Sequence, residues 1–118
     1  MHLISVAIAA LLTTVSAIRI TKPAAGDTVS CSQPIRFCWE AVVTDPPQFC
    51  LFLTNFIEFP PQIFDLRTRV ITDGGGCITI NPPNCPGPLR TTPYRIRATA
   101  CGDPNTIYAE SGDFRLIP

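Results

Sequence analysis

The chain has 118 residues, and its nine lysine and arginine residues balance nine aspartate and glutamate residues, so the formal net charge at pH 7 is zero. Neither sign of charge runs in a block, which argues against the dense basic surface that binds nucleic acid or another polyanion. Six cysteines and thirteen prolines are the other unusual features of the composition.

The N-terminal segment MHLISVAIAALLTTVSA is typical of a secretory signal peptide. Its apolar stretch ends in Val15-Ser16-Ala17, whose small residues fit a cleavage site. The stretch is too short to span a bilayer, which takes about 20 apolar residues. We therefore expect residues 1–17 to be removed, leaving one secreted domain, residues 18–118, that contains all six cysteines and is a candidate for a disulfide framework.

Removal of the leader has a chemical consequence, because His2 is the only histidine in the sequence. A mature chain beginning at Ile18 lacks the general base of Ser-His and Cys-His systems. It also lacks the ligand of histidine-based zinc sites and of a copper site at an N-terminal histidine. No C-x2-C pair suggests a four-cysteine zinc site. We expect no metal and no cofactor.

Short alternating apolar runs follow the leader, and no run has the period of a useful helix, so the domain is expected to be all-β. In each run one parity is apolar, as in Ile35, Phe37 and Trp39, and this parity is expected to face the core of a two-sheet sandwich. Proline and glycine clusters separate the runs. We expect strands at 18–22, 27–30, 34–40, 48–54, 66–71, 77–81, 93–101 and 112–117.

The segments IRITKPAAGDTV, PIRFCW, INPP, PYRIRAT and IYAESGDFRLI occur in this order along the domain. In order and spacing they resemble the N-terminal immunoglobulin-like domain of the yeast cell wall synthesis family, fungal secreted proteins of β-1,6-glucan assembly whose domain also occurs in Ser/Thr-rich GPI-anchored proteins. Ser32 stands where the family usually has glycine, and six cysteines exceed the family pattern. No Ser/Thr-rich stalk or apolar tail follows Phe114, so no GPI or other membrane anchor is expected.

The resemblance implies an immunoglobulin/fibronectin-like β-sandwich of about seven or eight strands. It implies that the strand at 34–40 pairs with the one at 77–81, and the strand at 48–54 with the one at 93–101. Six cysteines allow many pairings, among which the sequence alone does not choose. The implied strand order leads us to expect three disulfides, Cys31–Cys85, Cys38–Cys77 and Cys50–Cys101.

The segment FLTNFIEFPPQIFDL carries more apolar side chains than a crossover between strands needs. One part is expected to cover the end of the core, and the remainder to form an exposed patch for a partner. Our candidate binding residues are Phe56, Phe59 and Phe64.

Other features have structural explanations that we favour. Trp39 shares the parity of its apolar neighbours, so it is expected in the core rather than as a sugar-stacking platform. Tyr94 is expected to be a corner residue whose hydroxyl bonds to backbone. The glycine-rich TDGGGC precedes no helix, so it is expected to connect strands rather than bind phosphate.

Arginines alternate along several strand-like runs, at Arg36, Arg67, Arg69, Arg95 and Arg97. They predict a solvated outer sheet face with scattered carboxylate pairs, and a binding stripe for an acidic partner is the alternative. The acidic residues are scattered singly over turns and strand ends, whereas glycoside hydrolysis needs two carboxylates across a cleft.

Three function classes remain. The first, which the resemblance implies, is a non-enzymatic module of the fungal cell wall or extracellular matrix in β-glucan assembly or binding, with glucan or a wall protein as its partner. The second is a secreted effector that binds a host protein, to which small size, disulfides and lack of an anchor point. A carbohydrate-active enzyme is the least favoured. The sequence leaves the first two classes open.

Overall fold

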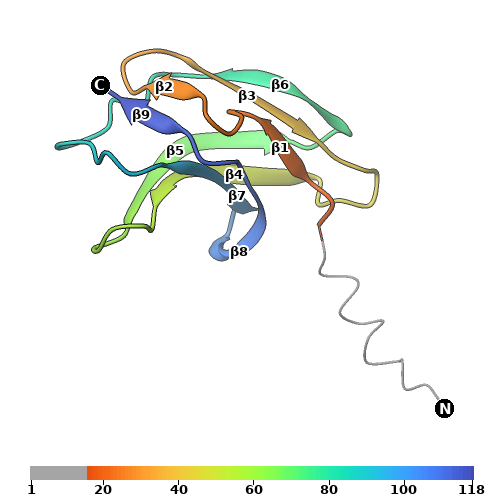
Figure 1. Ribbon diagram of the computed structural model, residues 1–118. Helices are drawn as coiled ribbons and strands as arrows, with labels where there is room; N and C mark the ends of the chain where they lie inside the picture. Colours follow the sequence, from red (N-terminus) through yellow and green to blue (C-terminus); the bar gives the residue numbers. More distant parts are fainter. Residues whose placement is uncertain (1–15) are drawn as a thin grey trace.

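The computed structural model describes residues 16–118, so the expected signal peptide, residues 1–17, lies almost wholly outside the described residues. The described chain is an all-β sandwich of two facing layers, as expected (Figure 1). Its strands are β1 (Arg19–Lys22), β2 (Thr28–Ser30), β3 (Ile35–Glu40), β4 (Gln48–Asn55), β5 (Gln62–Ile71), β6 (Gly75–Ile80), β7 (Arg95–Ala100), β8 (Asp103–Glu110) and β9 (Arg115–Ile117).

The strand order is that of an immunoglobulin-type sandwich. A three-stranded sheet has the order β1-β3-β6, a four-stranded sheet has the order β5-β4-β7-β8, and β2 and β9 form a small third sheet. The expected pairings of β3 with β6 and of β4 with β7 are both confirmed, and both are antiparallel. β2 and β9 pair in parallel. An isolated antiparallel bridge joins Tyr94, just before β7, to Phe114, just before β9.

Aromatic side chains from both sheets meet at the centre of the core. Phe37 and Trp39 of β3 have ring centroids 5.8 Å apart, and Phe49 of β4 lies 6.1 Å from Phe37 and 5.9 Å from Trp39. Trp39 is buried and donates its indole N–H to the carbonyl of Thr72 over 2.8 Å. Its expected place in the core is therefore confirmed, and its polar atom has the partner that a buried indole requires.

The TDGGG segment connects β5 to β6, as expected of a link between strands. Gly75 has a φ of +116°, and a Cβ built there would lie 2.9 Å from the Trp39 carbonyl oxygen. The glycines therefore allow the chain to pass close to β3, which explains their presence without a phosphate.

Residues 16–118 contain nine strands, one more than the eight ranges expected from the sequence, because residues 103–110 also form a strand, β8. The first five residues of β8 are all exposed, and it lies at the sheet edge, so burial imposes no apolar alternation on it. Backbone pairing with β7 holds it instead, for example between Ala98 and Ala109. β5 also starts earlier than expected, at Gln62, because it pairs with the end of β4.

The motif Ser111-Gly112-Asp113-Phe114 forms a β-bulge between β8 and β9. Ser111 donates its backbone N–H to the Ile96 carbonyl, and Phe114 exchanges two backbone hydrogen bonds with Tyr94. The segment from Ser111 to Phe114 is therefore one residue longer than the opposing segment from Tyr94 to Ile96. The Ser111 hydroxyl accepts the Ile96 N–H over 2.9 Å. The side chain thus takes the place of a backbone acceptor that the bulge has moved away.

This bulge packs against the turn that follows β1. A Cβ at Gly112 would lie 3.0 Å from the Cβ of Ala25, so only the smallest residue allows the two segments to approach without adjustment. Gly26 donates its N–H to the Asp113 carbonyl, and Arg115 donates its N–H to the Asp27 carbonyl, both over 2.8 Å. The segments IRITKPAAGDTV and IYAESGDFRLI, which open and close the sequence resemblance, therefore contact each other directly.

Three disulfides are present, between the same pairs that the resemblance implies. Cys31 is joined to Cys85, Cys38 to Cys77 and Cys50 to Cys101, with Cα separations of 5.6, 4.1 and 4.9 Å. Cys38 and Cys77 are directly opposed in the pairing of β3 with β6. The bridges link residues 39 to 54 positions apart, and in the chain-entropy picture each such loop is worth about 4 kcal/mol.

Peptide mapping of the secreted protein under non-reducing conditions should recover these three cross-linked pairs. A peptide in which Cys31 is joined to Cys38 would contradict the fold, because that bridge closes a local loop and leaves the pairing of β3 with β6 without its covalent link.

Candidate functional site

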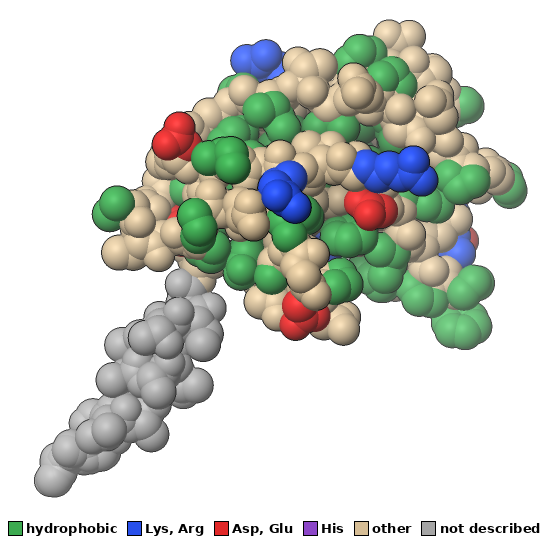
Figure 2. Space-filling model, turned by 180° about the vertical axis from the view of Figure 1, so that it is seen from behind, with side chains coloured by type: hydrophobic (Ala, Val, Ile, Leu, Met, Phe, Trp, Pro, Cys, Tyr) green, Lys and Arg blue, Asp and Glu red, His purple; other side chains and the backbone are tan. Residues whose placement is uncertain are grey.

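The expected crossover between strands is a hairpin that joins β4 to β5. Asn55 pairs with Gln62, and residues 56–61 form the connecting loop. We call residues 55–64 the phenylalanine hairpin. In Figure 1 it is the yellow-green projection at lower left, and hydrophobic side chains gather at the corresponding end of the molecule in Figure 2.

The structure places the three candidate phenylalanines differently. Phe59 is 92% exposed and Phe56 is 46% exposed. Phe64 pairs with Leu53 on the inner face of the sheet and is half-buried against the core, so it is less exposed than Phe56 and Phe59. Ile57, which sequence reasoning did not single out, is 60% exposed beside the two phenylalanines. Its place in the same apolar run was the available signal.

The side chain of Asn55 holds the first residues of the loop in place. This side chain is 1% exposed, and its amide group donates to the Thr92 hydroxyl over 2.9 Å. Its side-chain carbonyl accepts the backbone N–H groups of Ile57 at 3.1 Å and Glu58 at 3.4 Å. A buried amide with partners on both its oxygen and its nitrogen fixes the start of the loop to the segment before β7.

Arg90 and Thr92 hold the tip from the side. The Arg90 guanidinium donates to the carbonyls of Glu58, over 2.9 Å, and Pro60, over 2.5 Å. The Thr92 hydroxyl donates to the Glu58 carboxylate over 2.5 Å. The two Arg90 contacts satisfy backbone carbonyls of the loop that would otherwise depend on water.

Tyr94 connects the segment at Arg90 to the start of β5 at Gln62. It is fully buried, and its hydroxyl accepts the Arg90 backbone N–H over 3.1 Å and donates to the Gln62 side-chain oxygen over 2.6 Å. The first of these bonds is the backbone contact expected of a corner tyrosine, which is confirmed. These contacts order the exposed apolar tip before a partner binds. Binding therefore avoids the entropy cost of ordering the loop.

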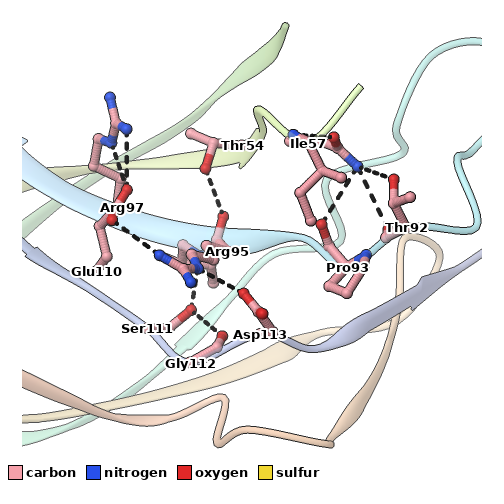
Figure 3. A network of polar contacts seen from close by, with 12 residues as sticks. Thr54, Ile57, Thr92, Pro93, Arg95, Arg97, Glu110, Ser111, Gly112 and Asp113 are labelled. Carbon is pink, nitrogen blue, oxygen red and sulfur yellow. Dashed lines mark hydrogen bonds and ion pairs between the residues drawn. The ribbon is translucent and has the colours of Figure 1, made fainter. Parts of the chain in front are cut away.

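A hollow of about 370 Å³ lies between the phenylalanine hairpin and an ionic network on the outer face of the sheet. The network is shown in Figure 3. The Glu110 carboxylate forms ion pairs with Arg97 at 3.0 Å and with Arg95 at 3.3 Å. Arg95 also donates to the Asp113 carboxylate over 2.6 Å. The guanidinium carbon of Arg97 lies 4.6 Å from the centre of the Phe56 ring, which is cation–π geometry.

Asp113 belongs to the bulge, which directs its side chain towards Arg95. The hydrogen bond to Asp113, together with the charge of that carboxylate, raises the pKa of the Arg95 guanidinium above its ordinary value. Arg95 and Arg97 therefore fit the expectation of an outer face with carboxylate pairs. No ion pair of Arg36, Arg67 or Arg69 occurs within residues 16–118.

Within residues 16–118 the structure contains no apolar helix of the length needed to span a bilayer. The same residues bring together no group of three or more histidine, cysteine, aspartate or glutamate side chains placed to hold a metal ion.

Comparison with known proteins gives one informative similarity. The chain is 30% identical over 115 residues to uncharacterized protein C553.10 of the fission yeast Schizosaccharomyces pombe. The match covers 98% of this chain and 32% of that protein, so the chain spans about a third of the length of its relative. No protein-family model matches the chain.

Replacing Tyr94 with phenylalanine should loosen the phenylalanine hairpin while preserving the aromatic core. The change removes one acceptor and one donor at a buried position, which should lower the free energy of unfolding by about 1–3 kcal/mol. Amide hydrogen exchange over residues 56–61 should accelerate more than elsewhere. Tyr108→Phe, in a half-buried tyrosine of β8 outside this network, is the control. Unchanged exchange in the loop of Tyr94→Phe would contradict the supporting role.

Proposed function

We propose that this protein is a secreted, non-enzymatic binding module of the fungal cell wall or extracellular matrix, engaging glucan or a wall protein. The observation that carries the proposal is the phenylalanine hairpin, which exposes Phe56, Ile57 and Phe59 on a loop held by buried polar contacts. A protein in water gains nothing from leaving large apolar groups exposed together, so such a patch commonly marks a binding surface.

Two sequence similarities support a fungal setting. The order of motifs resembles the immunoglobulin-like domain of cell wall synthesis proteins, and a fission yeast protein aligns along nearly the whole chain. Three disulfides are typical of proteins that fold in an oxidising compartment and work outside the cell. The predicted leader at residues 1–17 agrees with secretion.

A secreted effector that binds a host protein is the second candidate, and the chemistry of the tip favours it. Phe59 is almost fully exposed, and its neighbours Pro60 and Pro61 are also exposed and apolar. An aromatic anchor that enters an apolar pocket is typical of protein–protein interfaces. Capture experiments with purified glucan, with wall proteins and with host extracts separate the two candidates.

Phe59→Ser should weaken capture of the partner by about tenfold or more, since a buried aromatic anchor is typically worth about 2 kcal/mol of binding. Its melting temperature should stay within a few degrees of wild type, because exposed positions typically change stability by less than about 0.5 kcal/mol.

Val43→Ser is the matched control for this experiment. Val43 is 97% exposed in the connection between β3 and β4, away from the phenylalanine hairpin, so the change removes an equally exposed apolar side chain. Equal loss of capture in both variants would mean that general surface hydrophobicity, and not the phenylalanine hairpin, holds the partner.

The mature protein should release no reducing sugar from β-1,3-glucan, β-1,6-glucan or chitin. It has no histidine after residue 17, and the carboxylates of Glu110 and Asp113 are engaged by arginines. Sensitive reducing-end assays on rigorously purified protein test this. Turnover that is lost in a single carboxylate variant would overturn the non-enzymatic assignment.

A further inference from the structure

The hollow beside the phenylalanine hairpin is lined by both charged and apolar side chains. We infer that it binds an uncharged, hydroxyl-bearing ring, such as a hexose unit of a neutral glycan, with Arg95, Arg97, Glu110 and Asp113 selecting the ligand. This inference rests on the proposed function, because it assigns a ligand class to one part of the binding surface and separates it from the apolar tip.

Charge balance is the first argument. The hollow is lined by two arginines and two carboxylates, so its formal charge is zero. An anion drawn to Arg95 or Arg97 would also meet Glu110, which touches both, and a cation drawn to a carboxylate would meet an arginine. Like-charge contact of this kind disfavours ions of either sign. The remaining ligand class is uncharged.

Unused hydrogen-bonding capacity is the second argument. Arg95 bonds through Nε and Nη1, and Arg97 through Nε and Nη2. Within residues 16–118, Nη2 of Arg95, Nη1 of Arg97 and Oδ2 of Asp113 make no hydrogen bond. Donors and an acceptor therefore remain within one site. Hydroxyl groups match such a set, because each can donate and accept at once.

The apolar wall is the third argument. Phe56, Ile57 and Pro93 line the hollow together with the charged groups. Phe56 is about half exposed, and the contact with Arg97 holds its ring in place. A pyranose ring has an apolar C–H face as well as hydroxyls, so it can pack on this wall while bonding to the network. The volume, about 370 Å³, lies at the small end of ligand sites.

The Arg95–Asp113 pair adds little to stability, because its side chains are 47% and 46% exposed and ion pairs this open to water are weak. What the pairs do provide is fixed geometry, since each guanidinium is held by two hydrogen bonds. A preorganised array of this kind reduces the entropy cost of binding.

The test is an NMR titration of the disulfide-bonded protein labelled with 15N, using neutral oligosaccharides of glucose and, separately, of mannose. The Nε signals of Arg95 and Arg97 should shift and saturate with one of these probes. Affinity should change less than about twofold between low and high salt, because no charge on the ligand is screened. A sulfated oligosaccharide should bind more weakly than its neutral parent.

Two variants locate the site. Glu110→Gln and Asp113→Asn each remove a charged acceptor from the network while keeping side-chain size, and each should weaken binding by about tenfold, in line with the worth of hydrogen bonds to charged groups. Glu40→Gln is the matched control, since Glu40 is an exposed glutamate beside Arg19 in the opposite sheet, and it should bind normally. If either network variant has a lowered melting temperature, the Phe56→Leu variant, which changes the apolar wall of the hollow, tests the site instead.

The outcomes separate this inference from the proposed function. Binding that ignores both network variants and Phe56→Leu, or that prefers the sulfated probe and falls with salt, overturns the hollow as a neutral-glycan site. Absence of any oligosaccharide binding, with Phe59-dependent capture of a protein intact, overturns the inference and leaves the binding module. Absence of both overturns the two together.

Discussion

The position of Tyr94 is the constraint on which much of the structure depends. Its ring is fully buried between the sheets, its backbone exchanges hydrogen bonds with Phe114, and its hydroxyl joins the backbone of Arg90 to Gln62. One residue therefore connects the core, the closure of the sandwich by β9 and the base of the phenylalanine hairpin. Because a buried hydroxyl without partners would cost free energy, the core can be filled in this way only if both neighbouring segments lie where they do.

The second organising contact joins the two ends of the domain. The turn after β1 and the bulge before β9 exchange backbone hydrogen bonds, and they lie so close that a Cβ at Gly112 would require Ala25 to shift. The same bulge directs Asp113 outwards to Arg95, while Phe114 enters the core. A structural motif thereby positions one member of the ionic network, so the network depends on the closure of the fold.

The disulfides reinforce this arrangement by joining segments that lie far apart in the sequence. Each bridge joins segments at least 39 residues apart, so the unfolded chain loses much of its freedom. A domain of about 100 residues has a net stability of only about 5–15 kcal/mol, and cross-links of this kind are a large addition. They also permit exposed apolar residues at the hairpin tip, because stability does not rely on burying every apolar group.

The sequence by itself determined the all-β class, the inward parity of the strands and the place of Trp39 and Tyr94, because these depend on local alternation that burial on one sheet face imposes. It did not indicate β8, since an exposed edge strand held by backbone pairing needs no apolar pattern. It identified the apolar run of residues 52–64 but could not tell that Phe64 points inward while Ile57 points outward. Only the tertiary structure decided that Arg90 and Thr92 hold the loop and that Asp113 meets Arg95. Those contacts join residues 18 to 34 positions apart, and their geometry follows from how hairpin, bulge and sheet pack together.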